Sequence, residues 1–171
     1  DLPKGAEEAD GYDDLIRVTR DQIGRGADFI KIYADYRWGP NGTTQPAFTQ
    51  TEIETIVDVA NSSGRPVVAH ASTPEAIRRA TLAGVATIEH GNNATDESFR
   101  LMADNGVAFC PTLAAGHSIR TYSGWRPGVD PDPASIIRKR ESFARALASG
   151  VTICFGGDIG VYTHGNNVLE L

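Results

Sequence analysis

The sequence has 171 residues, of which 40% are hydrophobic and 22% are charged, values that are ordinary for one globular domain. Its formal net charge is −6 and it contains no long basic run, so we expect no nucleic acid as a partner. No apolar stretch approaches the roughly 20 residues that cross a bilayer, so we expect no membrane partner either.

Helical segments alternate with short apolar runs along the whole chain. Helices are predicted over residues 12–27, 49–64, 72–84, 94–106 and 132–150. Each of them precedes a predicted strand, and the strands cover residues 28–34, 65–71, 85–91, 107–113 and 151–158. Thr49 and Glu52 have the spacing of a capping box, and Thr73 followed by Pro74 is a typical helix start.

This alternation indicates an α/β fold with a parallel sheet buried on both faces. The two candidate architectures are a (β/α)₈ barrel and an open doubly wound sheet. The sequence contains no glycine-rich phosphate loop after its first strand, which disfavours a nucleotide-binding open sheet. Five strands do not close a barrel of eight. We therefore predict that residues 1–171 form one partial TIM-barrel domain, covering about strands 4 to 8.

A polar side chain lies in, or at the end of, four of the predicted strands. These side chains are Lys31, His70, His90 and Asp158. Because side chains alternate across a strand, all four are expected to face the barrel interior and to meet at the carboxyl ends of the strands. Glu89 alternates away from His90 and is expected to face the helices. Two imidazoles and a carboxylate suit zinc or a related divalent metal.

Lys31 has two interpretations. A buried lysine has a lowered pKa and reacts with CO₂ to give a carbamate, which would ligate a metal as a carboxylate does. The alternative is a buried lysine that pairs with an acid such as Asp35.

Four segments together resemble a known family. "GADFIKIYAD" (26–35), "VVAHA" (67–71), "GVATIEHGN" (84–92) and "FGGDIGVYTHG" (155–165) are similar to the metal-dependent amidohydrolase superfamily. The branch that they resemble most is the imidazolonepropionase-like and prolidase-like (Xaa-Pro dipeptidase) one, over about residues 12 to 171.

The resemblance implies a role for each of the four polar residues. Carbamylated Lys31 would bridge two metal ions, His70 and His90 would ligate the second ion, and Asp158 would ligate the first ion and act as the catalytic general base. The implied cofactors are one or two zinc or other divalent ions. The implied reaction is hydrolysis of a C–N bond in a small amide or dipeptide by a metal-activated hydroxide.

One element of the superfamily is absent from this sequence. Its first strand carries an HxH pair, whereas the four histidines here are His70, His90, His117 and His164, and none forms such a pair. The absence agrees with a barrel that lacks its first strands, so we expect an incomplete binuclear site and less than full activity from this chain alone.

Two other functions stay open at this point. A non-catalytic half-barrel would serve as a binding or assembly module, and its exposed strand edges favour a homo-oligomer. An open-sheet enzyme would use His70 as an acid–base group without metal. The sequence does not reveal the cellular location: a cytoplasmic one is slightly favoured, and a secreted or periplasmic one stays open if a leader is missing.

Two long segments, residues 35–48 and 114–128, follow predicted strands and are expected to be functional loops. Arginines there offer a fork that binds a substrate carboxylate. The predicted substrate contacts are Tyr33, Tyr36, Arg37, His117, Arg120, Tyr122 and His164. Cys110 and Cys154 lie in apolar runs and are expected to be buried free thiols.

Overall fold

The computed structural model describes residues 6–170, so residues 1–5 and 171 of the predicted domain lie outside the described part. Helices and strands alternate in the order α1 (Tyr12–Gly24), β1 (Ile30–Tyr33), α2 (Gln50–Asn61), β4 (Val67–Ala71), α3 (Pro74–Leu82), β5 (Thr87–His90), α4 (Asp96–Asp104) and β6 (Ala108–Cys110). After them come α5 (Leu113–Tyr122), α6 (Ala134–Ser149) and the 3₁₀ helix η2 (Asn167–Glu170). All the predicted helices and the first four predicted strands form within their predicted ranges.

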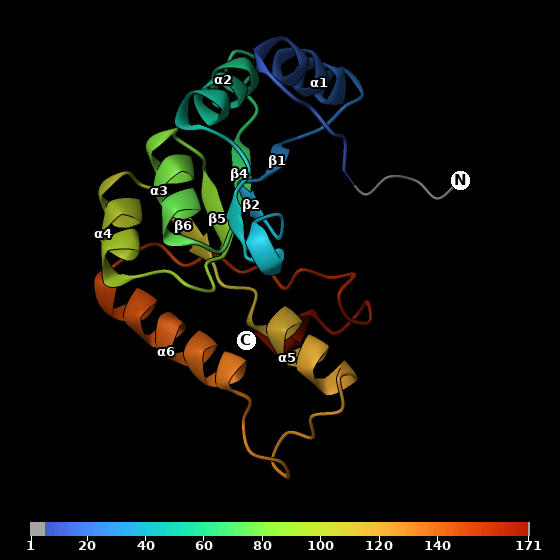
Figure 1. Ribbon diagram of the computed structural model, residues 1–171, viewed down its shortest axis with the longest axis vertical. Helices are drawn as coiled ribbons and strands as arrows, with labels where there is room; N and C mark the ends of the chain where they lie inside the picture. The colour runs from blue at the N-terminus through green and yellow to red at the C-terminus, as the bar shows by residue number, and fades with distance from the viewer. Residues whose placement is uncertain (1–5, 171) are drawn as a thin grey trace.

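The principal sheet is parallel and has the strand order β1-β4-β5-β6, so every strand pairs with the next principal strand along the chain. Helices α1, α2, α3, α4 and α6 pack side by side in this order and arc around the sheet, while α5 lies on the open side (Figure 1). A doubly wound sheet reverses its strand order. Sequential order with an outer layer of helices is instead the arrangement of a (β/α)₈ barrel wall.

Alternate strand residues build the core between the sheet and the helices. Ile32, Ala69, Ile88 and Phe109 follow one another across the sheet in register, and all of them are buried. Burial of an isoleucine stabilises a fold by about 1.5–3 kcal/mol. The neighbouring row faces the open side, where Tyr33 keeps 44% of its surface exposed.

The predicted capping interactions are confirmed. Thr49 Oγ1 accepts a hydrogen bond from the Glu52 backbone N–H at 3.3 Å, and the Glu52 carboxylate accepts one from the Thr49 backbone N–H at 2.8 Å. Thr73 caps α3 in the same way, with Pro74 at the first helical position. These local signals explain why the helix starts follow from the sequence.

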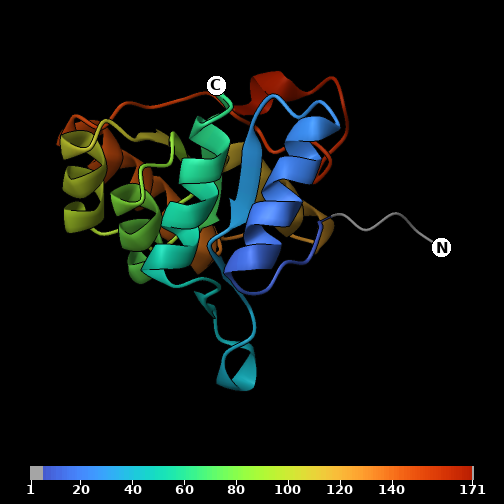
Figure 2. The same ribbon diagram turned by 90° about the horizontal axis from the view of Figure 1, so that it is seen from above.

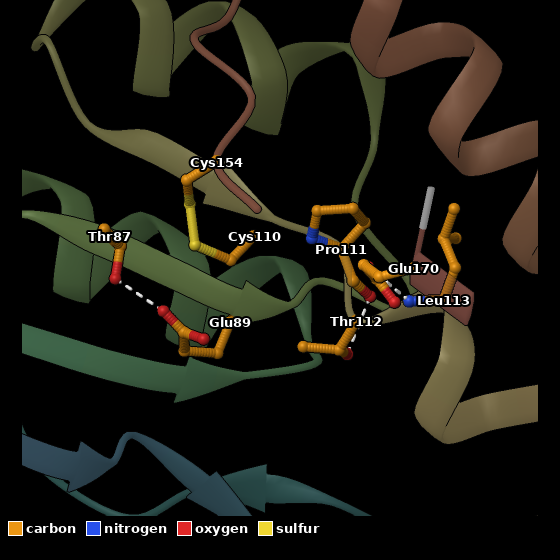
Figure 3. Close-up of a disulfide and its surroundings, with 8 residues drawn as sticks. All are labelled: Thr87, Glu89, Cys110, Pro111, Thr112, Leu113, Cys154 and Glu170. Carbon is orange, nitrogen blue, oxygen red and sulfur yellow. Dashed lines mark hydrogen bonds between the residues drawn. A yellow bond between two sulfur atoms is a disulfide. The ribbon is translucent and has the colours of Figure 1, made fainter. Parts of the chain in front are cut away.

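Helix α5 occupies a segment that was expected to be a loop. Its N-terminus has no side-chain cap from the preceding residue. Instead, the Glu170 carboxylate accepts a hydrogen bond from the backbone N–H group of Leu113 at 2.8 Å (Figure 3) and another from that of Ala114 at 2.7 Å. A cap supplied from the far end of the chain leaves no signal near the start of the helix.

The last predicted strand, residues 151–158, is reduced to one isolated bridge between Phe109 and Ile153. Two backbone hydrogen bonds hold it: Phe109 donates to Thr152 at 2.8 Å and accepts from Cys154 at 2.9 Å. Strand β6 is only three residues long, so it offers residues 151–158 few backbone groups with which to form a longer ladder.

The predicted loop 35–48 contains the short antiparallel pair β2 (Asp35–Tyr36) and β3 (Gln45–Pro46), with the 3₁₀ helix η1 (Pro40–Gly42) between them. Figure 2 shows this segment projecting away from the outer helices.

The expectation of free thiols is wrong. Cys110 and Cys154 form a disulfide with a Cα–Cα distance of 4.8 Å (Figure 3). The bridge between Phe109 and Ile153 places the two residues that follow them side by side. That pairing of segments 44 residues apart cannot be read from apolar character alone.

Within residues 6–170, no helix combines the length and the apolar character needed to cross a membrane.

Candidate active site

The carboxyl ends of the strands border a cavity of about 300 Å³. It brings together these predicted site residues: Lys31, Tyr33, Arg37, His70, His90 and Asp158. Asn92, Thr112, Lys139 and part of α5 complete the lining. A larger hollow of about 1290 Å³ lies along α1 and the free edge of β1, and no histidine lines it. The chemistry-bearing side chains therefore gather in the smaller cavity.

Tyr33, His70, Glu89 and Cys110 form one row across the sheet in register. Paired residues of a parallel sheet project to the same side, so this row faces the open side. The expectation that Glu89 faces the helices is wrong. Its carboxylate accepts a hydrogen bond from Thr87 at 2.6 Å (Figure 3), and the residue between them, Ile88, is the one buried against the helices.

His90 reaches the same side as His70 because its backbone leaves the strand conformation. Its φ is 73°, in the left-handed region, and the following Gly91 has a φ of 51°. A Cβ on Gly91 would lie 2.5 Å from the Phe109 ring, so only glycine fits this turn. The centroids of the His70 and His90 rings are 4.6 Å apart. The alternation of side chains along a strand does not predict that its last residue adopts a left-handed conformation.

The environment of His90 keeps its ring neutral. Burial is the largest cause, and the neighbouring His70, Lys139 and Lys31 add to it in lowering the pKa of His90 to about 3. Its Nδ1 lies 2.7 Å from the Thr112 hydroxyl oxygen. Its Nε2 makes no hydrogen bond to any residue between 6 and 170, so a nitrogen of a neutral ring is left to act as a ligand.

His70 is tied to a buried carboxylate. Asp35 is fully buried, and its Oδ1 lies 3.5 Å from His70 Nε2. Its Oδ2 accepts hydrogen bonds from the backbone N–H groups of Ser72 at 2.8 Å and Thr73 at 2.6 Å, and from the Thr73 hydroxyl at 2.9 Å. Burial opposes ionisation of Asp35, but His70 and these donors outweigh it and lower the pKa of the carboxyl. Sequence reasoning missed this role of Asp35.

Lys31 is exposed on the open face, and no described residue forms an ion pair or hydrogen bond with it. The alternative pairing with Asp35 is therefore not found. Asp158, from the last segment, is partly buried and has a left-handed φ of 57°.

Lys139 of α6 also lines the cavity and was not predicted. Its ammonium donates hydrogen bonds to the backbone carbonyl of His90 and, at 2.9 Å, to Asn92 Oδ1. Burial lowers the pKa of Lys139 to about 8. It thus joins α6 to the end of β5 at the point where the backbone of His90 turns.

Five predicted substrate contacts do not line this cavity. The His117 ring packs edge-on against Trp125 with centroids 5.1 Å apart, and Arg120, Tyr122 and His164 are exposed. Their roles stay predictions. Tyr36 packs against Tyr33 and lines the larger hollow.

Among residues 6–170, no group of three or more His, Cys, Asp or Glu side chains is arranged to hold a metal ion. His70 and His90 are adjacent, whereas further ligands are not gathered around them. The four residues predicted to converge thus share one cavity without forming a closed ligand set.

A sequential parallel wall with polar groups at the carboxyl ends of its strands defines part of a (β/α)₈ barrel. The chain belongs to the amidohydrolase family, whose model matches residues 8–171. This membership and the predicted partial barrel are both confirmed.

Three similar proteins illustrate the relationship. The crystal structure of a Xaa-Pro dipeptidase with methionine bound in its active site has a TM-score of 0.79 and 33% identity, over 95% of this chain and 42% of that one. Ochratoxinase of Aspergillus niger is 27% identical over 157 residues, 88% of this chain and 32% of the relative, and its crystal structure has a TM-score of 0.74. An uncharacterized protein of Mycobacterium tuberculosis is 26% identical over 162 residues, 91% of this chain. The chain spans less than half of each of these relatives.

Proposed function

We propose that this protein hydrolyses a C–N amide or peptide bond of a small substrate with the help of one or two divalent metal ions. The observation that carries the proposal is the His70–His90 pair, whose ring centroids are 4.6 Å apart in the lining of the cavity. The amidohydrolase family and the similarity to a Xaa-Pro dipeptidase support it.

The residues present fit one side of a metal site. His90 is neutral, and each ring has one nitrogen engaged by a neighbour and one left available. Neutral imidazole is a common zinc ligand, and its second nitrogen is usually held by an outer partner. His70 and His90 would hold the ion, with Asp158 and carbamylated Lys31 as further ligands. The rest of the barrel would complete the set and bury Lys31.

A bound divalent metal would lower the pKa of water from 15.7 towards about 7 and so supply a nucleophile at neutral pH. The chain's own residues would do the remaining work. The Asp158 carboxylate would take the proton from the attacking water and return it to the leaving nitrogen. Asp35 and Thr112 would hold the two imidazole rings in place.

A substrate with a free carboxylate suits the cationic rim of the cavity. Arg37 and Lys139 line it, and a guanidinium binds a carboxylate through two parallel hydrogen bonds. Dipeptides, Xaa-Pro among them, and cyclic amides are the substrate classes that we propose.

The test is an assay of amino-acid release from a panel of Xaa-Pro dipeptides by the full gene product. We expect cleavage that chelation abolishes and added divalent metal restores, and a loss of at least about 100-fold in His70→Ala. Asp58→Ala, on the exposed face of α2, serves as the control that keeps full activity. Hydrolysis that survives chelation would contradict the proposal.

A non-catalytic partial barrel is the second candidate, favoured by the lack of a closed ligand set within residues 6–170. It predicts neither metal binding nor cleavage in the same assays. Homo-oligomerisation stays a prediction of this candidate, to be measured by light scattering.

A further inference from the structure

We infer that Thr112 is a positioning residue that fixes the His90 ring as its Nδ1–H tautomer and so leaves Nε2 as the nitrogen with a free lone pair. The consequence for metal binding rests on the proposed function, whereas the tautomer itself does not.

The argument starts from the hydrogen bonds of the Thr112 hydroxyl. The hydroxyl has one hydrogen to donate and two lone pairs that accept. Its oxygen lies 2.7 Å from the Pro111 carbonyl oxygen and 2.7 Å from His90 Nδ1. A carbonyl oxygen only accepts, so the hydroxyl hydrogen goes to Pro111. The hydroxyl oxygen is then left to accept, and His90 Nδ1 must carry the hydrogen between them.

Thr112 is held firmly enough to impose this choice. It is only 3% exposed, and its φ of 51° lies in the left-handed region, which β-branched residues rarely adopt. Such a conformation persists where the surroundings over-determine it, and it is frequent at functional sites. Two residues before it, Cys110 is tied to Cys154 by the disulfide, and directly after it the start of α5 is capped by Glu170 (Figure 3).

The neighbouring histidine shows the complementary arrangement. His70 Nε2 faces Asp35 Oδ1, which only accepts, so the hydrogen of a neutral His70 ring belongs on Nε2 and the lone pair on Nδ1. Each histidine therefore has an acceptor facing one of its nitrogens, at 2.7 Å for His90 and at 3.5 Å for His70, and leaves the other nitrogen free. Outer acceptors of this kind set the tautomer of metal-binding histidines and alter metal affinity when they are removed.

The experiment is ¹⁵N NMR of the histidine side chains, in which long-range ¹H–¹⁵N correlations distinguish the two tautomers. We expect the Nδ1–H pattern for His90 in the metal-free chain and in Thr112→Ser, which keeps the hydroxyl. Thr112→Val keeps the shape and the β-branch but removes the acceptor, so the His90 pattern should move towards Nε2–H. The signals of His117 and His164 should not change. An Nε2–H pattern in the unaltered chain would overturn the inference, as would an unaltered pattern in a folded Thr112→Val.

A zinc titration of the same variants separates this inference from the proposed function. We expect Thr112→Val to bind zinc 10- to 100-fold more weakly and Thr112→Ser to bind within about threefold of the unaltered chain. If Thr112→Val does not fold, Thr112→Ala is measured in its place, with the same expectations. A His90 ring in the Nδ1–H form in a chain that does not bind zinc would keep the inference and count against the proposed function. A chain that binds zinc but has His90 in the Nε2–H form would overturn the inference and leave the proposed function standing.

Discussion

Replacement of Asp35 by alanine should destabilise the fold strongly, because its carboxylate joins three segments in the interior. The side chain is fully buried and accepts hydrogen bonds from two backbone N–H groups and one hydroxyl at the start of α3. Asp35→Ala leaves the N–H groups of Ser72 and Thr73 without this acceptor. An unsatisfied buried donor costs about 1–3 kcal/mol, and hydrogen bonds to a charged group contribute about 1.5–3 kcal/mol each.

We therefore expect Asp35→Ala to lower the free energy of unfolding by about 3–5 kcal/mol, a large part of the 5–15 kcal/mol typical of a domain. Asp35→Asn keeps an acceptor for the start of α3 but loses the charge, so it should cost about 1–2 kcal/mol.

Urea unfolding followed by circular dichroism measures these changes. Asp58→Ala, which removes an exposed carboxylate, is the matched control and should stay within about 0.5 kcal/mol of the unaltered chain. A loss below 1 kcal/mol for Asp35→Ala would refute the assignment of Asp35 as the acceptor that joins β2, the end of β4 and the start of α3.

Three further predictions concern stability. Arg78 and Arg79 lower the pKa of Glu75 from 4.5 to about 2, so the contribution of its ion pairs is fully present above pH 4.5 and is lost as the pH falls through 2. Glu75→Gln should cost at most about 1 kcal/mol at pH 7, because the group is exposed. The difference from the unaltered chain, measured by thermal unfolding, should shrink steadily below pH 4.5 and be small at pH 2. A cost that is as large at pH 2 as at pH 7 would show that it does not come from the ionised carboxylate. The Cys110–Cys154 disulfide closes a loop across 44 residues, so its reduction should lower the free energy of unfolding by about 2–4 kcal/mol. Urea titrations with and without a dithiol measure this loss, and the double variant Cys110→Ser with Cys154→Ser should show no effect of the dithiol. Glu170→Ala removes the cap of α5 and should cost about 1–2 kcal/mol with faster amide exchange at Leu113 and Ala114, and unchanged exchange there would contradict the capping role.

The outer helices and most of the sheet could be predicted because their signals are local. Apolar spacing and the caps at Thr49 and Thr73 mark the starts of α2 and α3 within a few residues of sequence. Helix α5 depends on Glu170 near the other end of the described chain, and the disulfide depends on the pairing of Phe109 with Ile153. Contacts between distant segments of this kind leave no periodic pattern.

The same distinction applies to the site. His70 and His90 could be predicted because each ends an apolar strand, and both line the cavity. The residues that hold their rings, Asp35 and Thr112, come from other elements and were missed. The predicted orientation of Glu89 was wrong because the left-handed turn at His90 ends the alternation of side chains along β5, so Glu89 and His90 do not face opposite sides.

Metal analysis of the purified full gene product tests the central claim most directly. After equilibrium dialysis against zinc and removal of free ion, mass spectrometry should find at least about one zinc per chain, and His70→Ala with His90→Ala should lower this content by about one. His164→Ala, an exposed histidine outside the cavity, should leave the zinc content unchanged. Zinc retained equally by the double variant, or absent from the unaltered full gene product, would contradict the account that these two histidines are metal ligands.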